Sequence, residues 1–297
     1  MKIERCVNNP LLTPADVKPS RQDFKVDGVF NCGVTEYKGE VILLCRVAES
    51  VICKNEDEVC VPIVKKVDGK DEIQVITYRK SECPQLDFSD TRHVSKRGEK
   101  KSNILNLTSL SHLRIARSKD GIHFEIDEHP AIFPRKINGK YVAFNRPVPG
   151  GIGNPQMWIA KSPDLIHWGE QRHFCGISSD TESWDDGRIG GGAVPFLTKK
   201  GWVKIYHAAD RNDRYCLGAF LLDEKDPSIV LAKTKDPILE PQEEYEKKGF
   251  FGEVVFTCGC LVKDNKVILY YGAADDKICR ADFELDDLFA AMEYVDI

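Results

Sequence analysis

Apolar and polar positions follow one pattern four times along the chain. A polar turn with glycine or asparagine precedes a run of strand-forming residues, and the run ends in a polar or small residue. The four copies span Tyr37–Glu49, Ile137–Pro149, Lys199–Asp210 and Lys263–Asp275. Apolar runs bounded by turn residues are typical of β-strands. We therefore expect strands at about residues 41–46, 141–146, 202–207 and 266–271.

The spacing of the copies indicates a repeated unit. The equivalent positions Arg46, Arg146, His207 and Gly272 are 100, 61 and 65 residues apart. Short strands that recur at a long period are typical of propeller blades, whereas a β-sandwich, the alternative all-β fold, has no reason to repeat a whole unit. The sequence predicts an all-β fold, a single β-propeller domain over residues 1–297, with the four strands innermost around its axis.

Composition and charge narrow the class of partner. The chain has 297 residues, of which 42% are hydrophobic and 30% charged, with a net charge of −5 and no long basic run. This balance argues against nucleic acid as a partner. A membrane span needs about 18 consecutive apolar residues, and no segment of the sequence comes near that length. The N-terminal residues lack the apolar stretch of a signal peptide, so we expect a cytoplasmic protein. One short helix is expected at Asp287–Met292.

Eleven cysteines are present, but their odd number and irregular spacing give no disulfide framework. We expect them to be reduced and mostly buried. Cys258 and Cys260 are two residues apart in a predicted strand and should share one face. Zinc sites need clustered ligands of the CxxC type, and the sequence has none, so no metal is expected.

Basic side chains recur at the ends of the predicted strands. Arg46, Arg146 and His207 each end one, where side chains can converge on a propeller axis. Arg188 precedes the glycines Gly190–Gly192, which allow a close approach of backbone to a ligand. A guanidinium donates two parallel hydrogen bonds to phosphate, so this set indicates an anion pocket. In the alternative interpretation the arginines form ion pairs between blades, and His207 is a hydrogen-bonded core histidine.

Motifs spread from Asn9 to Asp275 carry a more specific signal. In order they include NPLLTP, VFNCGV, RIARSKDGIHF, NRPV, WDDGRIGGGAVPF, GWVKIYHAAD, GFFGEVVFTCG and YYGAAD. Together they resemble glycoside hydrolase family 130, the mannoside phosphorylases and mannosidases, and most nearly its bacterial enzymes for β-1,2-linked mannosides. The resemblance covers nearly the whole chain. It implies a five-bladed propeller with the active site in a central funnel.

The resemblance also implies roles for particular residues. Positions that hold the mannosyl unit in the −1 subsite match Asn31, Arg46 and Asp275. Positions that hold phosphate, or the sugar beside it, match Arg146, Arg188 and His207. The implied partners are a mannoside oligosaccharide and inorganic phosphate as co-substrate, with no other cofactor. The oligomeric state is left open, a homo-oligomer being one option.

Three functions follow as hypotheses. In the first, phosphate attacks the anomeric carbon of a β-mannoside with inversion and releases mannose 1-phosphate. In the second, an inverting hydrolase uses a carboxylate to activate water, for which Glu253 is the candidate base and a solvated strand-edge carboxylate the alternative. In the third, the chain is a sugar-binding propeller without catalysis. A structural or interaction protein is the least favoured alternative.

One departure from the family affects which of these three functions the chain can perform. Family members carry a complete blade, with a GIEDPRI-like motif whose aspartate is the general acid, between the RIARSKDGIHF and NRP strands. Here only nine residues separate Glu125 from Arg135. Three explanations for the missing blade remain open: a natural four-bladed variant, a deletion, or a sequence that lacks a stretch. The string FSDTRHV at Phe88–Val94 matches a different family loop, so the acid role is not assigned to Asp90.

Overall fold

The computed structural model describes residues 1–67, 70–98, 104–127, 141–145, 156–162, 169–178 and 183–295. These residues form an all-β structure, as predicted, with two short α-helices, α1 (Glu244–Lys247) and α2 (Leu285–Ala290), and 3-10 turns at Pro14–Asp16 and Lys80–Glu82. Helix α2 overlaps the helix expected from the sequence. Within the described ranges, no helix has the length and hydropathy to cross a membrane.

The N-terminal sheet consists of four antiparallel strands in the order β10-β9-β3-β2. Their bounds are β2 (Phe24–Tyr37), β3 (Glu40–Val51), β9 (Ser109–Ser118) and β10 (Glu125–Asp127). Strands β2 and β3 form a hairpin whose turn contains Lys38 and Gly39, both at positive φ. The glycine in the repeated pattern therefore marks a real turn.

The C-terminal sheet contains a strand from the other end of the chain. Its order is β1-β21-β20-β19, with β1 (Glu4–Arg5), β19 (Val255–Lys263), β20 (Lys266–Ala273) and β21 (Lys277–Glu284). Strand β1 pairs with β21, and Leu12 forms a further bridge to Ile278. Residues near the N-terminus thus complete a sheet whose other three strands lie within residues 255–284.

Two more sheets lie between these in the chain. One contains β11 (Tyr141–Asn145), β12 (Met157–Ser162) and β13 (Gly169–Cys175). The other has the order β14-β16-β17-β18-β22, and β15 also pairs with β16. Its bounds are β14 (Arg188–Gly190), β15 (Phe196–Thr198), β16 (Gly201–Ala209), β17 (Tyr215–Leu222), β18 (Val230–Thr234) and β22 (Met292–Tyr294).

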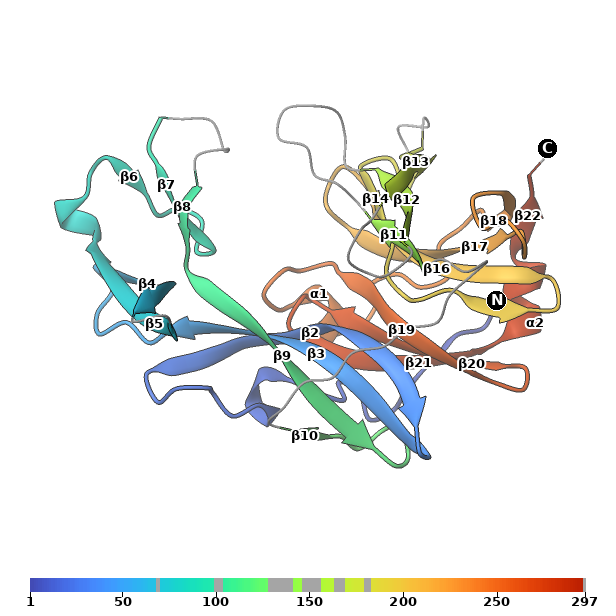
Figure 1. Ribbon diagram of the computed structural model, residues 1–297, viewed down its shortest axis with the longest axis horizontal. Coiled ribbons are helices and arrows are strands. Elements are labelled where there is room, and N and C mark those ends of the chain that lie inside the picture. The colour runs from blue at the N-terminus through green and yellow to red at the C-terminus, as the bar shows by residue number, and fades with distance from the viewer. Residues whose placement is uncertain are drawn as a thin grey trace.

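An insertion separates β3 from β9. It comprises the hairpin β4 (Glu58–Val67) and β5 (Lys70–Arg79), followed by the sheet β6 (Leu86–Asp87), β7 (His93–Lys96) and β8 (Ile104–Leu107). Figure 1 shows the insertion, in teal, at the end of the molecule away from the labelled termini. The sequence pattern did not distinguish these strands from a polar loop.

The four predicted strands are present as β3, β11, β16 and β20. For three of them the position within the sheet differs from the prediction, whereas β11 is an edge strand of the sheet β11-β12-β13. Strands β3, β16 and β20 are paired on both sides, and the edge of each sheet is taken by the strand that precedes it, namely β2, β14 with β15, or β19. Strands β2 and β19 contact each other across the two sheets. In β3, β16 and β20 the repeated run is apolar because the strand is central in its sheet, which the pattern cannot distinguish from proximity to an axis.

The C-terminal sheet is buried on both faces. Tyr271 of β20 belongs to an apolar cluster with Ile205 and Leu217, while its neighbour Tyr270 belongs to a second cluster with Leu43. Successive side chains of a strand point to opposite faces. A strand covered on both faces is apolar at nearly every position, which explains the uninterrupted run from residue 267 to 273.

The expected joint near Pro134 and Arg135 lies outside the described residues. Strand β10 ends at Asp127 and pairs with β9 as the outer strand of the N-terminal sheet. Whether a blade is absent at that joint stays a prediction of the sequence.

Candidate active site

Asp275 lies in a strained turn at the end of β20. Ala274 and Asp275 have φ values of 48° and 58°, a conformation that is uncommon for residues other than glycine. Backbone hydrogen bonds hold this turn from both sides. The Ala274 N–H donates to the Val254 carbonyl oxygen at 3.0 Å, and the Phe251 N–H donates to the Ala274 carbonyl oxygen at 2.9 Å. Strain that surrounding contacts maintain in this way is frequent at functional sites.

Asn31 and Arg46 lie beside this turn on the N-terminal sheet. A β-bulge between Phe30 and Gly33 leaves Asn31 at φ 52°, and its buried Oδ1 has no hydrogen-bond partner among the described residues. The Arg46 guanidinium lies 4.9 Å from the Phe30 ring centre, and its Nε donates to Ser111 Oγ at 3.0 Å. A buried oxygen without a donor costs free energy unless a ligand supplies one.

The charge state of Asp275 depends on its neighbours. Burial raises the pKa of Asp275 from 3.8 to about 6, with a smaller contribution from Asp276, while the positive charges of Arg46 and Arg92 oppose the rise. The carboxyl group therefore titrates near neutral pH, and two arginines from different parts of the chain face it.

Arg92 is a site residue that the sequence did not predict. It follows β6 in the insertion, and Asp90 fixes its guanidinium with hydrogen bonds of 2.9 Å to Oδ1 and 2.7 Å to Oδ2. These bonds hold the pKa of Asp90 well below its ordinary value, which favours the ionised carboxylate. The guanidinium also lies 6.0 Å from the Phe251 ring centre. The only signal in the sequence was the pair of charges two residues apart in FSDTRHV.

A second cluster surrounds Arg188 at the start of β14. Its Nη1 donates to the Tyr215 hydroxyl at 3.1 Å, and its Nη2 pairs with the Asp213 carboxylate. His207 is buried, and its ring stacks on Phe256 with centroids 3.8 Å apart. The structure therefore brings Arg188 and His207 together around Tyr215, whose ring centre is 6.2 Å from that of His207. Tyr215, Asp213 and Phe256 were not predicted from the sequence.

Gly272 joins the two clusters. It pairs with Phe256 across β20 and β19, and a Cβ atom at Gly272 would lie 3.7 Å from both Asn31 Oδ1 and Phe256 Cβ. The missing side chain keeps these two groups within reach of one ligand. The two clusters on either side of Gly272 make up the candidate site: Asn31, Arg46, Arg92, Arg188, His207 and Asp275.

Two further residues were predicted from the sequence. Arg146 lies outside the described residues. Glu253 is exposed at φ 58°, its carbonyl oxygen accepts the Tyr215 N–H at 3.0 Å, and its carboxylate lies 3.9 Å from Arg214 Nε. Arg214 also pairs with Glu240 at 2.7 Å. The Glu253 carboxylate therefore lies at the margin of the second cluster.

The antiparallel sheets and the basic cluster beside their strand ends agree with a carbohydrate-active enzyme, and comparisons with known proteins identify the family. The chain belongs to glycoside hydrolase family 130, whose sequence model, described as beta-1,4-mannooligosaccharide phosphorylase, matches residues 90–294. The predicted resemblance is confirmed. The family contains mannoside phosphorylases and glycoside hydrolases.

Individual relatives extend the similarity to the whole chain. Beta-1,2-mannobiose phosphorylase of Listeria innocua serovar 6a is 38% identical, over 99% of each chain. A solved structure of beta-1,2-mannobiose phosphorylase from Listeria innocua in complex with beta-1,2-mannobiose gives a TM-score of 0.89, covering 98% of this chain and 99% of that chain. The 1,2-beta-oligomannan phosphorylase of Thermoanaerobacter sp. is 44% identical over 55% of this chain and 53% of its own length.

The alignment with the Listeria innocua protein is longer than this chain. It extends over 357 positions, whereas this chain has 297 residues, so about 60 positions hold no residue of this chain. That difference is large enough for a blade of four strands.

Proposed function

We propose that this chain is an inverting β-mannoside phosphorylase whose substrates are β-1,2-linked mannooligosaccharides. Similarity over 99% of both chains to a protein named beta-1,2-mannobiose phosphorylase carries the proposal. In the proposed reaction a phosphate oxygen forms a bond to the anomeric carbon from the face opposite the leaving sugar. The glycosidic C–O bond breaks, the leaving oxygen takes a proton, and mannose 1-phosphate is released. We further propose that the sheets are blades of a β-propeller with this site in its funnel.

The two clusters divide the substrates between them. Asn31, Arg46 and Asp275 are proposed to bind the mannosyl unit, because a buried acceptor, a donor and a carboxylate face one space there. Arg188 and His207, with Arg146, are proposed to bind phosphate. The Tyr215 hydroxyl and the Asp213 carboxylate orient the Arg188 guanidinium, so its position is set before phosphate arrives.

The general acid is unassigned. Removal of a positioned acid typically costs about 10²–10⁴-fold in rate. We therefore expect slow turnover by the chain, unless a carboxyl group outside the described residues provides the proton.

Incubation with β-1,2-mannobiose, with and without inorganic phosphate, tests the proposal. We expect mannose 1-phosphate and mannose in equal amounts, and only when phosphate is present. Release of mannose alone, independent of phosphate, would show hydrolysis, and Glu253→Gln should then abolish it. Saturable binding of mannobiose without any product would identify a sugar-binding protein instead.

Arg188→Ala tests the phosphate assignment. Loss of a charge-assisted pair should raise the KM for phosphate by at least about tenfold. The affinity for mannobiose should change much less. Arg79→Ala removes an exposed arginine paired with Glu82 in the insertion and serves as the matched control. An unchanged KM for phosphate in Arg188→Ala contradicts the assignment.

A further inference from the structure

Two cysteines lie against each other where the chain leaves β3 and enters the insertion. Cys53 follows β3, and Cys60 lies near the start of β4. The turn between them is closed at Asn55, whose carbonyl oxygen accepts the Glu58 N–H at 3.2 Å and whose Oδ1 accepts the Asp57 N–H at 3.1 Å. Asparagine bonds of this kind stabilise tight turns, so the chain reverses and brings Cys60 back to Cys53.

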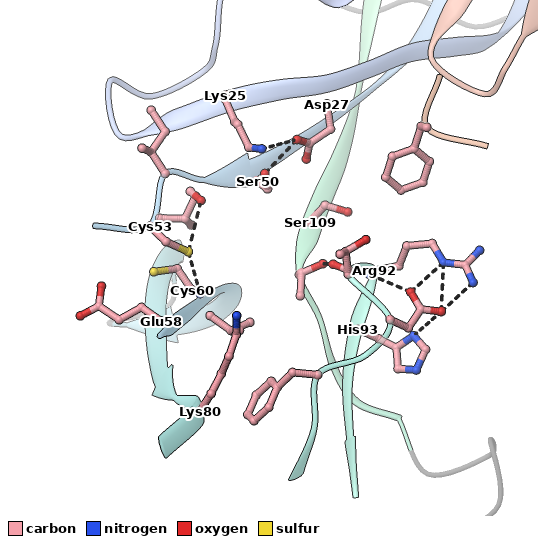
Figure 2. Close-up of a pocket in the computed structure, with 18 residues that line it drawn as sticks. Lys25, Asp27, Ser50, Cys53, Glu58, Cys60, Lys80, Arg92, His93 and Ser109 are labelled. Carbon is pink, nitrogen blue, oxygen red and sulfur yellow. Dashed lines mark hydrogen bonds and ion pairs between the residues drawn. The ribbon is translucent and has the colours of Figure 1, made fainter. Parts of the chain in front are cut away.

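The backbone of β4 is directed at the sulfur atom of Cys53. The Cys60 N–H donates to Cys53 Sγ at 3.3 Å, and the Cys53 thiol donates to the Val51 carbonyl oxygen at 4.0 Å. The nitrogen and the sulfur of one cysteine are joined through Cα and Cβ alone, so rotation of the Cys60 side chain brings the two sulfur atoms within reach of each other. Figure 2 shows both sulfur atoms on the same side of the turn.

The two thiols differ in their access to solvent. Cys53 is exposed and borders a space of about 620 Å³ between the N-terminal sheet and the insertion. Cys60 is only 8% exposed and packs with Phe24 of β2 and Val51 of β3. Burial raises the pKa of Cys60 to about 11, and the hydrogen bond with the Cys53 thiol adds to the rise. A dissolved reagent therefore meets Cys53 first.

This arrangement is typical of a reactive dithiol. Exposed thiols that exchange with disulfides frequently lie next to a second thiol that resolves the mixed disulfide. Both cysteines are free in the structure, so the pair is present in its reduced form.

A second pair of thiols provides the contrast. Cys32 of β2 is hydrogen-bonded with Cys258 of β19, but they are 1% and 8% exposed and belong to the apolar cluster of Leu43. A dissolved disulfide reaches neither sulfur atom while the two sheets are packed together. Contact between thiols is common to both pairs, whereas an exposed partner is present only at Cys53 and Cys60.

We propose that Cys53 and Cys60 form a redox-active dithiol, which small disulfides of the glutathione type convert to a reversible intramolecular disulfide. Cys53 loses its proton to solvent and attacks one sulfur atom of the small disulfide. The S–S bond of that molecule breaks, and its first thiol leaves with a proton from solvent. Cys60 then loses its proton and attacks the Cys53 sulfur, and the second thiol leaves protonated. Two protein thiols are oxidised, and one small disulfide is reduced to two thiols.

The disulfide ties the start of the insertion to the segment that follows β3. The junction between the N-terminal sheet and the insertion is then covalent in the oxidised protein and open in the reduced one. Mannosides and phosphate take no part in the exchange, so the inference is independent of the proposed phosphorylase activity.

Tryptic peptides detect the bond directly. Trypsin cleaves after Lys54, so Cys53 lies in the peptide 47–54 and Cys60 in the peptide 55–65. The folded protein is incubated with glutathione disulfide, the remaining thiols are blocked with iodoacetamide in denaturant, and the digest is analysed without reduction. We expect the two peptides to be linked, and dithiothreitol to separate them.

The second thiol is already in place, so the linked form should exceed the glutathione adduct of Cys53 at least about tenfold. If Cys53 stays reduced, or accumulates only as the glutathione adduct, the inference is overturned.

Two serine variants test the order of attack. In Cys60→Ser the exposed thiol lacks its partner, so Cys53 should accumulate the glutathione adduct. In Cys53→Ser the buried Cys60 should stay reduced. Because Cys53 is exposed, its replacement leaves the packing around Phe24 intact and keeps the test valid if Cys60→Ser does not fold. An adduct that forms on Cys60 in Cys53→Ser as fast as on Cys53 in Cys60→Ser contradicts the proposed order.

Cys32 and Cys258 are the matched control within the same digest. They lie in the peptides 26–38 and 249–263, which should remain unlinked because both thiols are buried. If the two pairs are oxidised to the same extent, the reaction follows unfolding of the protein rather than the exposure of Cys53, and the inference is wrong.

Discussion

Asp275 combines a buried carboxyl group with a backbone conformation that few residues adopt. Its raised pKa means that the folded protein binds the proton more tightly than the unfolded chain. The contribution of Asp275 to the free energy of unfolding should therefore be fully present below the unfolded pKa near 3.8 and be lost as the pH rises through about 6.

Asp275→Asn should remove that dependence on pH. An amide is uncharged at every pH, and asparagine tolerates positive φ as well as aspartate does. We expect the variant to be more stable than the parent at pH 7.5, by on the order of 2 kcal/mol, and to bind mannobiose poorly. Urea unfolding at pH 4.5 and 7.5 measures the change.

Asp264→Asn is the control for this prediction. Asp264 has φ 55° at the other end of β20 but is exposed to water. The control should retain the pH dependence of the parent. If Asp275→Asn and the parent differ in stability by the same amount at pH 4.5 and at pH 7.5, the raised pKa of Asp275 is contradicted.

Single residues were predicted from the sequence only where a motif carried them. The resemblance predicted roles for Asn31, Arg188 and His207, whereas the position of Arg92 depends on how the insertion folds over the N-terminal sheet. Cys258 and Cys260 illustrate the same limit. A β-bulge between Thr257 and Gly259 shifts the register, so Cys258 packs with the cluster of Leu43 while Cys260 packs against that of Leu217. The expectation that they share a face was wrong because a bulge leaves no trace in alternation.

At the scale of elements, two hairpin turns of the repeated pattern differ in what surrounds their glycine. Gly39 has φ +80° and open space where a Cβ atom would lie. Gly201 has φ +128°, and a Cβ atom there would lie 2.3 Å from the Leu222 carbonyl oxygen. The same turn residue is therefore required for conformation alone at one position and for space as well at the other.

Alanine at each glycine should separate these two causes. Gly39→Ala should lower the free energy of unfolding by about 1 kcal/mol, the cost of a left-handed conformation. Gly201→Ala should lower it by about 3 kcal/mol, because β16 and β17 must also move apart. Chemical denaturation measures both. Equal losses would show that the contact with Leu222 relaxes freely.

Central strands were the elements that the sequence predicted best. Strands such as β16 and β20 are buried on both faces, so their apolar runs are long and their turns are marked by glycine or asparagine. Short strands at sheet edges, such as β14, β15 and β1, carry too few residues for a pattern. Their positions are set by pairing with distant strands, which a local pattern does not contain.

At the scale of the whole molecule, a buried ion pair connects the N-terminal strand to the C-terminal half. Glu246 is fully buried and accepts hydrogen bonds from Arg5 Nε at 2.8 Å and from the Tyr271 hydroxyl at 2.7 Å. Burial alone would raise the pKa of Glu246, but Arg5 and the backbone N–H groups of Gln242 and Glu243 outweigh it, so the pKa is lowered.

Glu246→Ala should destabilise the fold severely. Removal of one partner leaves the Arg5 guanidinium without its carboxylate, which typically costs about 3–5 kcal/mol. Glu244→Ala, two residues away, removes an exposed carboxylate paired with Lys248 and should leave the melting temperature nearly unchanged. Thermal unfolding of the two variants, measured side by side, shows whether the loss of stability comes from removing a buried carboxylate or from removing any negative charge in this segment.

The pairing of β1 with β21 also constrains the order in which the chain can fold. Glu4 pairs with Asp282, and Leu12 with Ile278, so these partners are separated by most of the polypeptide. On a ribosome the N-terminal segment emerges first and stays without its partners until the last sheet has been synthesised. Contacts between such distant residues close late, because the loop entropy must be overcome before they form. The C-terminal sheet is then complete only near the end of translation, and until that moment the backbone of β1 is open to pairing with a neighbouring chain.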